Sequence, residues 1–269
     1  MLKERILTAA ILAIVVVVAV LGLPVAGFGV ALLAVVLLGA WEWARLAGIE
    51  RNRDRLLYGG AVLALVLALW PLLGHSGFVG GLMMMVVAFW GMALGWMRRY
   101  IEQPDRRDRI AVVAGAGLVV LVAPWVALVA LHGQFGATSV LFLLLLVSTA
   151  DIGAFFAGRR WGRRKLAPTL SPGKTWEGVV GGGVVTLALA LVGAGVLGVS
   201  GHWFWFVVVC MVTVAFSIVG DLFESMVKRQ RRFKDSGSLL PGHGGVLDRI
   251  DSLTAAAPIF LLGLYGMRG

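Results

Sequence analysis

Charged residues are scarce in this 269-residue sequence, and their scarcity excludes an ordinary soluble enzyme. Only 14% of the residues are charged, whereas 59% are hydrophobic, and the mean hydropathy is +0.92. Soluble globular domains carry about 25% charged residues. The composition therefore indicates an integral membrane protein.

Cysteine is almost absent as well. The one cysteine, Cys210, lies inside an apolar run, so the chain can form no internal disulfide and offers no pair of thiols to a metal ion. No linker, low-complexity segment or internal repeat divides the sequence. We expect one membrane domain over residues 1–269, with scaffolding and assembly spans in residues 1–137 and a catalytic half in residues 138–269.

Nine apolar runs are each close to the ~20 residues that a helix needs to cross the hydrocarbon core. The sequence therefore predicts an all-α, polytopic transmembrane fold of about nine spans. The expected spans are residues 5–22, 25–44, 57–73, 78–97, 110–131, 138–157, 177–199, 203–226 and 249–267. The first run leads into a second span without a small-residue cleavage site, so we expect a retained helix rather than a signal peptide.

Acidic residues are few, 14 against 24 Lys and Arg, and the net charge is +10. If the N-terminus is cytoplasmic and the spans alternate, every Lys and Arg except Arg268 falls on the cytoplasmic side, as the positive-inside rule requires. Short loops between spans form no surface for nucleic acid, so we expect no nucleic-acid partner. Anionic lipid headgroups and phosphate-bearing substrates explain the charge better.

The densest polar segment, residues 217–251, contains five acids and six bases. On a helix, four of its residues would share one face because they fall at i, i+3, i+4 and i+7. These residues are Asp221, Glu224, Ser225 and Lys228. Asp248 and Asp251, which are three residues apart, would likewise share one helix face at the start of the last apolar run. Mg²⁺ usually takes one or two carboxylates and completes its shell with water and phosphate, so the segment predicts a magnesium–phosphate site.

Taken singly, these residues have ordinary structural explanations. A Lys or Arg at the end of a span is a solvated anchor, Asp248 would cap a helix, and His243 between glycines would be a turn residue. Membrane anchoring relies on cations, however, and does not explain five acids set among the bases. Their joint occurrence favours a functional site.

A second polar region begins inside the sixth span with Asp151. A carboxylate within the membrane is costly and is typical of a functional site, the alternative being a structural partner for a nearby cation. The following loop contains Ser171-Pro172-Gly173-Lys174-Thr175, which lacks P-loop spacing but places a Lys and hydroxyls before a helix, where phosphate binds well. Ser171 or Thr175 would cap that helix.

Residues 225–251 resemble the signature of the phosphatidate cytidylyltransferase family, S-x-x-K-R-x-x-x-x-K-D-x-x-x-x-x-P-G-H-G-G-x-x-D-R-x-D, and every fixed position is filled. Residues 150–178, with A-D-I-G-A-F-F-A-G-R and K-L-A-P-T-L-S-P-G-K-T-W-E-G, resemble the family's second shared block. The first five spans resemble the family only in hydrophobicity and topology.

The resemblance implies an enzyme of phospholipid biosynthesis that joins CTP and phosphatidate to give CDP-diacylglycerol and pyrophosphate. It also implies a requirement for Mg²⁺, often with a monovalent cation such as K⁺, and a homodimer in the cytoplasmic (inner) membrane with its site open to the cytoplasm. The expected catalytic residues are Lys228, Arg229, Lys234, Asp235, His243, Asp248, Arg249 and Asp251. The expected substrate-binding residues are Asp151, Ser171, Lys174, Ser225, Gly244 and Gly245, and the expected metal ligands are Asp221, Asp248 and Asp251.

We expect a phosphatidate oxygen to attack the α-phosphorus of CTP, with positioning and charge neutralisation in place of a side-chain nucleophile. A cation-coupled transporter with an ion path through Asp151, Asp221 and Asp251 is the first alternative, although the charges cluster at one face. A CDP-alcohol phosphotransferase is the second, and its D-G-x-x-A-R…G-x-x-x-D-x-x-x-D pattern does not occur.

Overall fold

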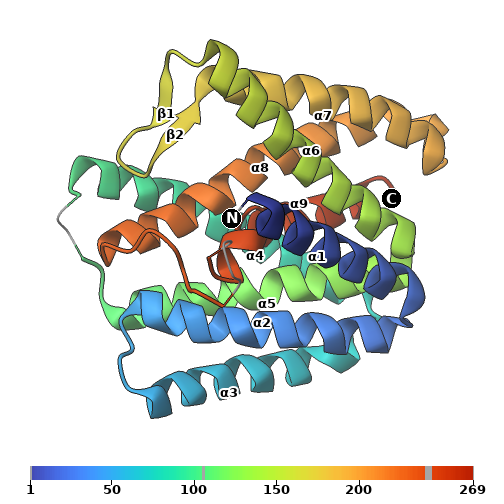
Figure 1. The fold of residues 1–269 in the computed structure, drawn as a ribbon. Coiled ribbons are helices and arrows are strands. Elements are labelled where there is room, and N and C mark those ends of the chain that lie inside the picture. The colour runs from blue at the N-terminus through green and yellow to red at the C-terminus, as the bar shows by residue number, and fades with distance from the viewer. Residues whose placement is uncertain (1, 105–106, 240–243, 269) are drawn as a thin grey trace.

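The computed structural model describes residues 2–104, 107–239 and 244–268, and these ranges form a bundle of nine α-helices (Figure 1). The helices are α1 (Leu2–Gly22), α2 (Val25–Ala47), α3 (Asn52–Leu69), α4 (Ser76–Glu102), α5 (Ile110–Phe135), α6 (Ala137–Trp161), α7 (Trp176–Val196), α8 (Trp203–Gln230) and α9 (Leu247–Gly266). Two 3-10 turns, η1 (Trp70–Leu72) and η2 (Ser200–His202), and two strands, β1 (Lys165–Ala167) and β2 (Ser171–Thr175), complete the described elements.

Each helix coincides with one predicted apolar run, which confirms the helical, polytopic character of the chain. Seven of the described helices, α2 to α8, are long and apolar enough to cross a membrane. The apolar part of α1, Ala10–Gly22, is shorter, and α9 begins with three charged residues among its first five. Nine crossings and a cytoplasmic N-terminus therefore stay predictions.

The expectation of an all-α chain missed a small hairpin between α6 and α7. Strands β1 and β2 pair antiparallel, with Lys165 opposite Thr175 and Ala167 opposite Ser171. Strands of three and five residues are too short to show alternation in the sequence. Thr175 also caps α7, since its Oγ1 accepts a hydrogen bond from the Gly178 N–H at 3.1 Å.

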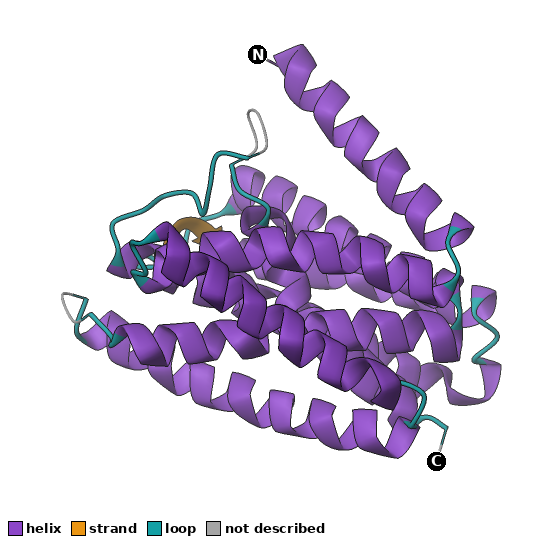
Figure 2. Ribbon diagram, turned by 90° about the horizontal axis from the view of Figure 1, so that it is seen from below, coloured by secondary structure: helices purple, strands orange, loops and turns teal. Residues whose placement is uncertain are grey.

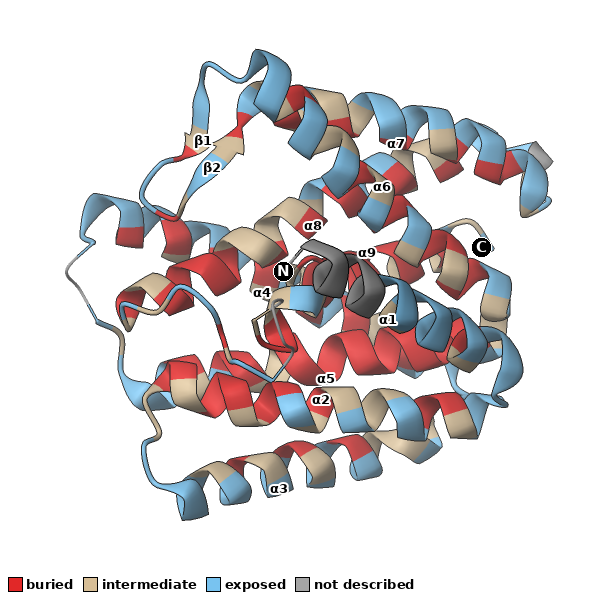
Figure 3. Cartoon of the chain, viewed as in Figure 1, coloured by how far each residue is buried: buried red, intermediate tan, exposed pale blue. Residues whose placement is uncertain are grey.

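Helices α5 and α9 form the centre of the bundle. Of the most apolar 18 residues of each helix, 72% are buried in α5 but only 11% in α3, which lies at the edge of the bundle (Figure 3). Helix α9 packs against α4, α5, α6 and α8. Because protein rather than lipid surrounds α9, its charged first turns can be stabilised by neighbouring side chains. Helices from both halves of the chain thus enclose the start of α9.

Helices α6 and α7 pack closely through small residues. A Cβ added to Gly178 would lie 2.8 Å from the Ala154 carbonyl oxygen, and one added to Gly182 would lie 2.9 Å from the Ala150 carbonyl oxygen. These glycines hold β2 and the start of α7 against the polar part of α6.

We predict that Gly182→Ala lowers the stability of the protein, because overpacking a close helix contact costs about 1–3 kcal/mol. Gly195→Ala on the same helix is the matched control, since no atom lies within 4 Å of a Cβ there. Ala is the better helix former, so the control should be neutral or more stable. Thermal unfolding in detergent measures both, and equal stability of the two variants would contradict the packing argument.

Candidate active site

The C-terminal end of α8 connects the loops at one end of the bundle. Arg231 donates a hydrogen bond to the Ala47 carbonyl at the end of α2, at 2.7 Å. The Gln230 amide donates to Asp108, which precedes α5, at 2.7 Å. Figure 1 shows the β-hairpin at this same end. The loops that the charge pattern assigned to one side therefore do lie together.

The predicted polar face of α8 is present. The Lys228 Nζ lies 3.2 Å from the Glu224 Oε1, and the Ser225 hydroxyl donates to the Asp221 Oδ1 at 3.3 Å. Lys228 and Glu224 are only 8% and 2% exposed. The face is turned into the protein, toward α9, rather than toward solvent.

Asp248 joins α8, α9 and the loop between them (residues 231–246). Its Oδ1 lies 2.7 Å from the Lys228 Nζ. Its Oδ2 accepts hydrogen bonds from the N–H groups of Gly245 and Ser236 at 2.8 and 2.9 Å, and from the Ser236 hydroxyl at 3.0 Å. Both oxygens of Asp248 are therefore engaged with protein donors, and its predicted role as a metal ligand stays a prediction.

A second group of charges, here called the acid–lysine cluster, consists of Asp151 (α6), Lys174 (β2), Asp221 (α8) and Asp251 (α9). The Lys174 Nζ pairs with the Asp221 Oδ2 at 2.5 Å and interacts electrostatically with the other two acids. Asp221 is also close enough to repel both of them. Ser252 donates its hydroxyl to Asp151 at 3.5 Å. Four elements distant in sequence thus place three acids and one ammonium group within electrostatic range of one another.

Two cavities open beside this cluster, and Asp151 lines both. The larger, about 380 Å³, is lined on its polar side by Asp151, Arg159, Ser171, Lys174 and Thr175. The smaller, about 170 Å³, is lined by Asp151, Ser148, Asp248, Arg249, Asp251 and Ser252. A cation-rich cleft therefore adjoins an acid-rich recess, which suits a phosphate group bound together with a metal ion.

The described residues contain no preformed group of three Asp, Glu, His or Cys side chains that could hold a metal ion. Mg²⁺ needs only one or two carboxylates when water and phosphate supply the other ligands. The Lys174 ammonium pairs with Asp221 and is within electrostatic range of Asp151 and Asp251, so its surroundings favour positive charge. If Mg²⁺ binds here, Asp221 and Asp251 are the residues that would hold it.

The other predicted catalytic residues lie in the α8–α9 loop and in the helix ends on either side of it. Arg229 donates to the Leu170 carbonyl in the hairpin turn and to the Phe233 carbonyl, both at 3.3 Å, so it holds the hairpin against α8. Lys234, Asp235 and Arg249 are exposed, and Arg249 lines the smaller cavity. His243 lies outside the described residues.

Gly244 and Gly245 are needed for space and conformation. Gly244 has φ +80°, a left-handed value that favours glycine, and a Cβ there would lie 2.7 Å from the Asp248 Oδ2. The Gly245 N–H is bonded to Asp248 rather than free for a phosphate. In this arrangement the two glycines shape the loop around Asp248.

Glu42 of α2 is the residue that the sequence analysis missed. It is 3% exposed, and its Oε1 accepts the Val246 N–H at 3.0 Å. Its Oε2 accepts the Leu247 N–H at 2.9 Å and shares the Ser236 hydroxyl, at 3.0 Å, with the Asp248 Oδ2. Glu42 thus satisfies amide groups at the start of α9, which no side chain of α9 caps. The available signal was an acid between two tryptophans, Trp41 and Trp43, in an otherwise apolar run.

Known proteins match this chain over nearly its whole length. The model of the cytidylyltransferase family matches residues 3–265. A protein of Pseudomonas aeruginosa named phosphatidate cytidylyltransferase is 44% identical, over 98% of this chain and 97% of its own length. Proteins of the same name from Haemophilus influenzae and Brucella suis are 38% and 37% identical, over 97% and 89% of this chain and 97% and 84% of their own lengths.

These matches extend across both halves of the chain, including the first five helices, where the sequence resemblance rested on hydrophobicity alone. They confirm the family indicated by residues 150–178 and 225–251. The chain belongs to the cytidylyltransferase family.

Proposed function

We propose that this protein is a phosphatidate cytidylyltransferase, which transfers CMP from CTP to phosphatidate and releases pyrophosphate. The observation that carries this proposal is the 44% identity, over 98% of the chain, to a protein of that name. The acid–lysine cluster supports it, because a reaction between two phosphate-bearing substrates needs cations and metal-binding carboxylates in one place.

The reaction needs no nucleophilic side chain. An oxygen of the phosphatidate phosphate forms a bond to the α-phosphorus of CTP, while the bond from that phosphorus to the oxygen bridging the β-phosphorus breaks. The electron pair leaves with pyrophosphate. The protein contributes by bringing two anions together and by neutralising their charge.

The residues of the site divide between charge neutralisation and positioning. Lys174, which pairs with Asp221 in the structure, would exchange this partner for a substrate phosphate, with Ser171 beside it in the cleft. Asp221 and Asp251 would hold Mg²⁺, which supplies neutralisation of the phosphate oxygens. Lys228 and Asp248 hold α8, α9 and their loop in register.

Exposed residues at the mouth of the site would bind the triphosphate. Lys234 and Arg249 are exposed, and Arg249 lines the smaller cavity, so their charges can meet an anionic ligand. Asp235 would orient these groups, and Ser225 would contact the substrate near Asp221. These assignments are supported by position and charge.

For topology, we propose a cytoplasmic N-terminus, nine crossings and a site that opens to the cytoplasm from the inner membrane. The support is the segregation of Lys and Arg residues, since the loops that carry them meet at one end of the bundle. A homodimer is also proposed, with CTP and lipids rather than nucleic acid as ligands. A second cation such as K⁺ belongs to the same proposal.

The function is tested by incubating the purified protein with phosphatidate, Mg²⁺ and CTP labelled at the α-phosphate. We expect label in the lipid fraction and an equal amount of pyrophosphate. A transporter would produce neither, and a CDP-alcohol phosphotransferase would not consume CTP. Folded protein that yields no labelled lipid would contradict the proposal.

We predict that Asp221→Asn and Asp251→Asn each lower kcat at least about 100-fold, because the loss of groups that merely support a metal ligand already costs 10–100-fold. Both variants should also need more Mg²⁺ for half-maximal rate, which a Mg²⁺ titration of initial rates measures. Asp54→Asn, at an exposed position in the first turn of α3, is the control. Unchanged rates and Mg²⁺ dependence in the two site variants would remove the assigned metal role.

We predict that Glu42→Gln lowers kcat about 10- to 100-fold, as the loss of a group that orients active-site residues does. The reason is that an amide offers one acceptor oxygen where the carboxylate offers two, so part of the α8–α9 loop loses its anchor. Glu50→Gln, exposed in the connection between α2 and α3, is the matched control. Wild-type turnover by Glu42→Gln would show that the loop holds its position without this carboxylate.

A further inference from the structure

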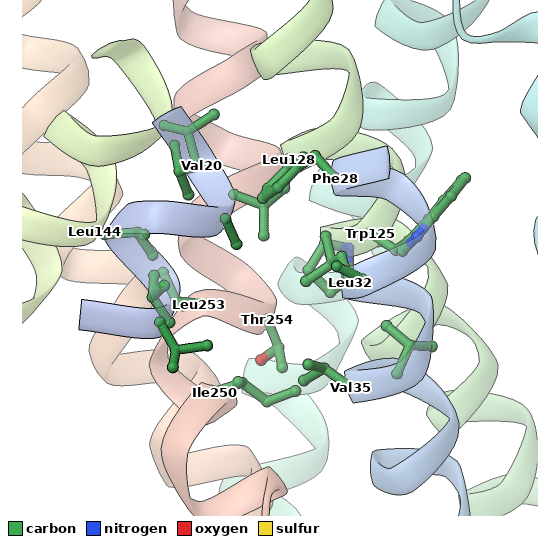
Figure 4. A pocket seen from close by; sticks show the side chains of 17 residues that line it. Val20, Phe28, Leu32, Val35, Trp125, Leu128, Leu144, Ile250, Leu253 and Thr254 are labelled. Atoms are coloured by element: carbon green, nitrogen blue, oxygen red, sulfur yellow. The ribbon is translucent and has the colours of Figure 1, made fainter. Parts of the chain in front are cut away.

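An apolar pocket of about 240 Å³ lies between α1, α2, α5, α6 and α9 (Figure 4). Val20, Phe28, Leu32, Leu128 and Leu253 are among its lining residues. The polar atoms of its side chains are already bonded. The Thr254 hydroxyl donates to the Asp251 carbonyl at 2.6 Å, and the Trp125 Nε1 donates to the Gly29 carbonyl at 2.9 Å. The pocket therefore suits a hydrocarbon rather than a polar ligand.

This pocket adjoins the acid-rich recess of the candidate active site. Leu144 and Leu253 line both cavities. Along α9, Ile250, Leu253 and Thr254 line the apolar pocket, whereas Asp248, Arg249, Asp251 and Ser252 line the recess. The two sets alternate along α9, so adjacent faces of this helix present charged groups and hydrocarbon, and Leu253 lies where the two faces meet.

The pocket wall formed by α1 is attached to the bundle yet open on its outer side. The His132 Nε2 lies 2.9 Å from the Val20 carbonyl oxygen, and the His132 ring stacks on Phe28 with centroids 4.8 Å apart. Val15 and Val16, which also line the pocket, are 57% and 41% exposed. Figure 2 shows the N-terminal part of α1 leaning away from the other helices. A lipid chain can therefore reach the pocket from the membrane side.

We propose that this pocket binds part of one acyl chain of phosphatidate while the lipid phosphate lies at the acid–lysine cluster. The proposal rests on the function proposed above. A volume of about 240 Å³ equals roughly eight times the ~30 Å³ share of a water molecule. This volume suits a segment of one acyl chain, and the proposal leaves the second chain in the surrounding lipid.

The test fills the pocket with a large side chain introduced on α2. Ala31 and Ala34 lie one turn apart on this helix and are both exposed, but only Ala31 lines the pocket. With Ala31→Trp, the KM for a long-chain phosphatidate should rise at least about 10-fold, the effect of a few methylene groups in an apolar pocket. Turnover of dihexanoyl phosphatidate and the KM for CTP should stay unchanged. Ala34→Trp should behave as wild type with both lipids.

Equal losses with long and short chains, or equal behaviour of the two Trp variants, would overturn the proposal. A second measurement uses the wild-type protein and a phosphatidate with a photoreactive diazirine in the middle of one chain. Labelling of the pocket residues of α2 or α9 supports the proposal, and labelling elsewhere alone overturns it. Because labelling requires binding and no turnover, it decides on the pocket even if the labelled-CTP assay contradicts the proposed function.

Discussion

The rest of the site depends on two ion pairs of the Lys228 ammonium, one with Glu224 of α8 and one with Asp248 of α9. A charge removed from water is costly unless opposite charges surround it, and here the partners belong to different helices. Asp248 in turn accepts hydrogen bonds from the α8–α9 loop. Since the same two helices carry acids of the acid–lysine cluster, helix packing and site geometry are established together.

The sequence predicted those features that depend on local pattern. Apolar runs of sufficient length identified all nine described helices, and helical periodicity placed Asp221, Glu224, Ser225 and Lys228 on one face of α8. The same periodicity placed Asp248 and Asp251 at the start of α9. Signature spacing identified the family, which the full-length relatives confirm.

Contacts between distant segments could not be predicted in this way. Glu42 lies about two hundred positions from the amides it binds, and nothing in its neighbourhood identifies those partners. The hairpin is too short for its pattern to be visible. Asp248 resembles a metal ligand in sequence, but only coordinates show that both of its oxygens are engaged with Lys228, Ser236 and Gly245. Hydrogen-bond partners are a property of packing and not of spacing.

The Glu42 carboxylate of α2, which binds the amides at the start of α9, also limits how this protein can be divided. Every signature residue lies in residues 138–269, which suggests that this portion could fold and act without the rest of the chain. Without α2, however, the Val246 and Leu247 amides would lose the carboxylate that accepts their hydrogen bonds. A chimera that joins this catalytic portion to the membrane helices of another protein must therefore also include α2.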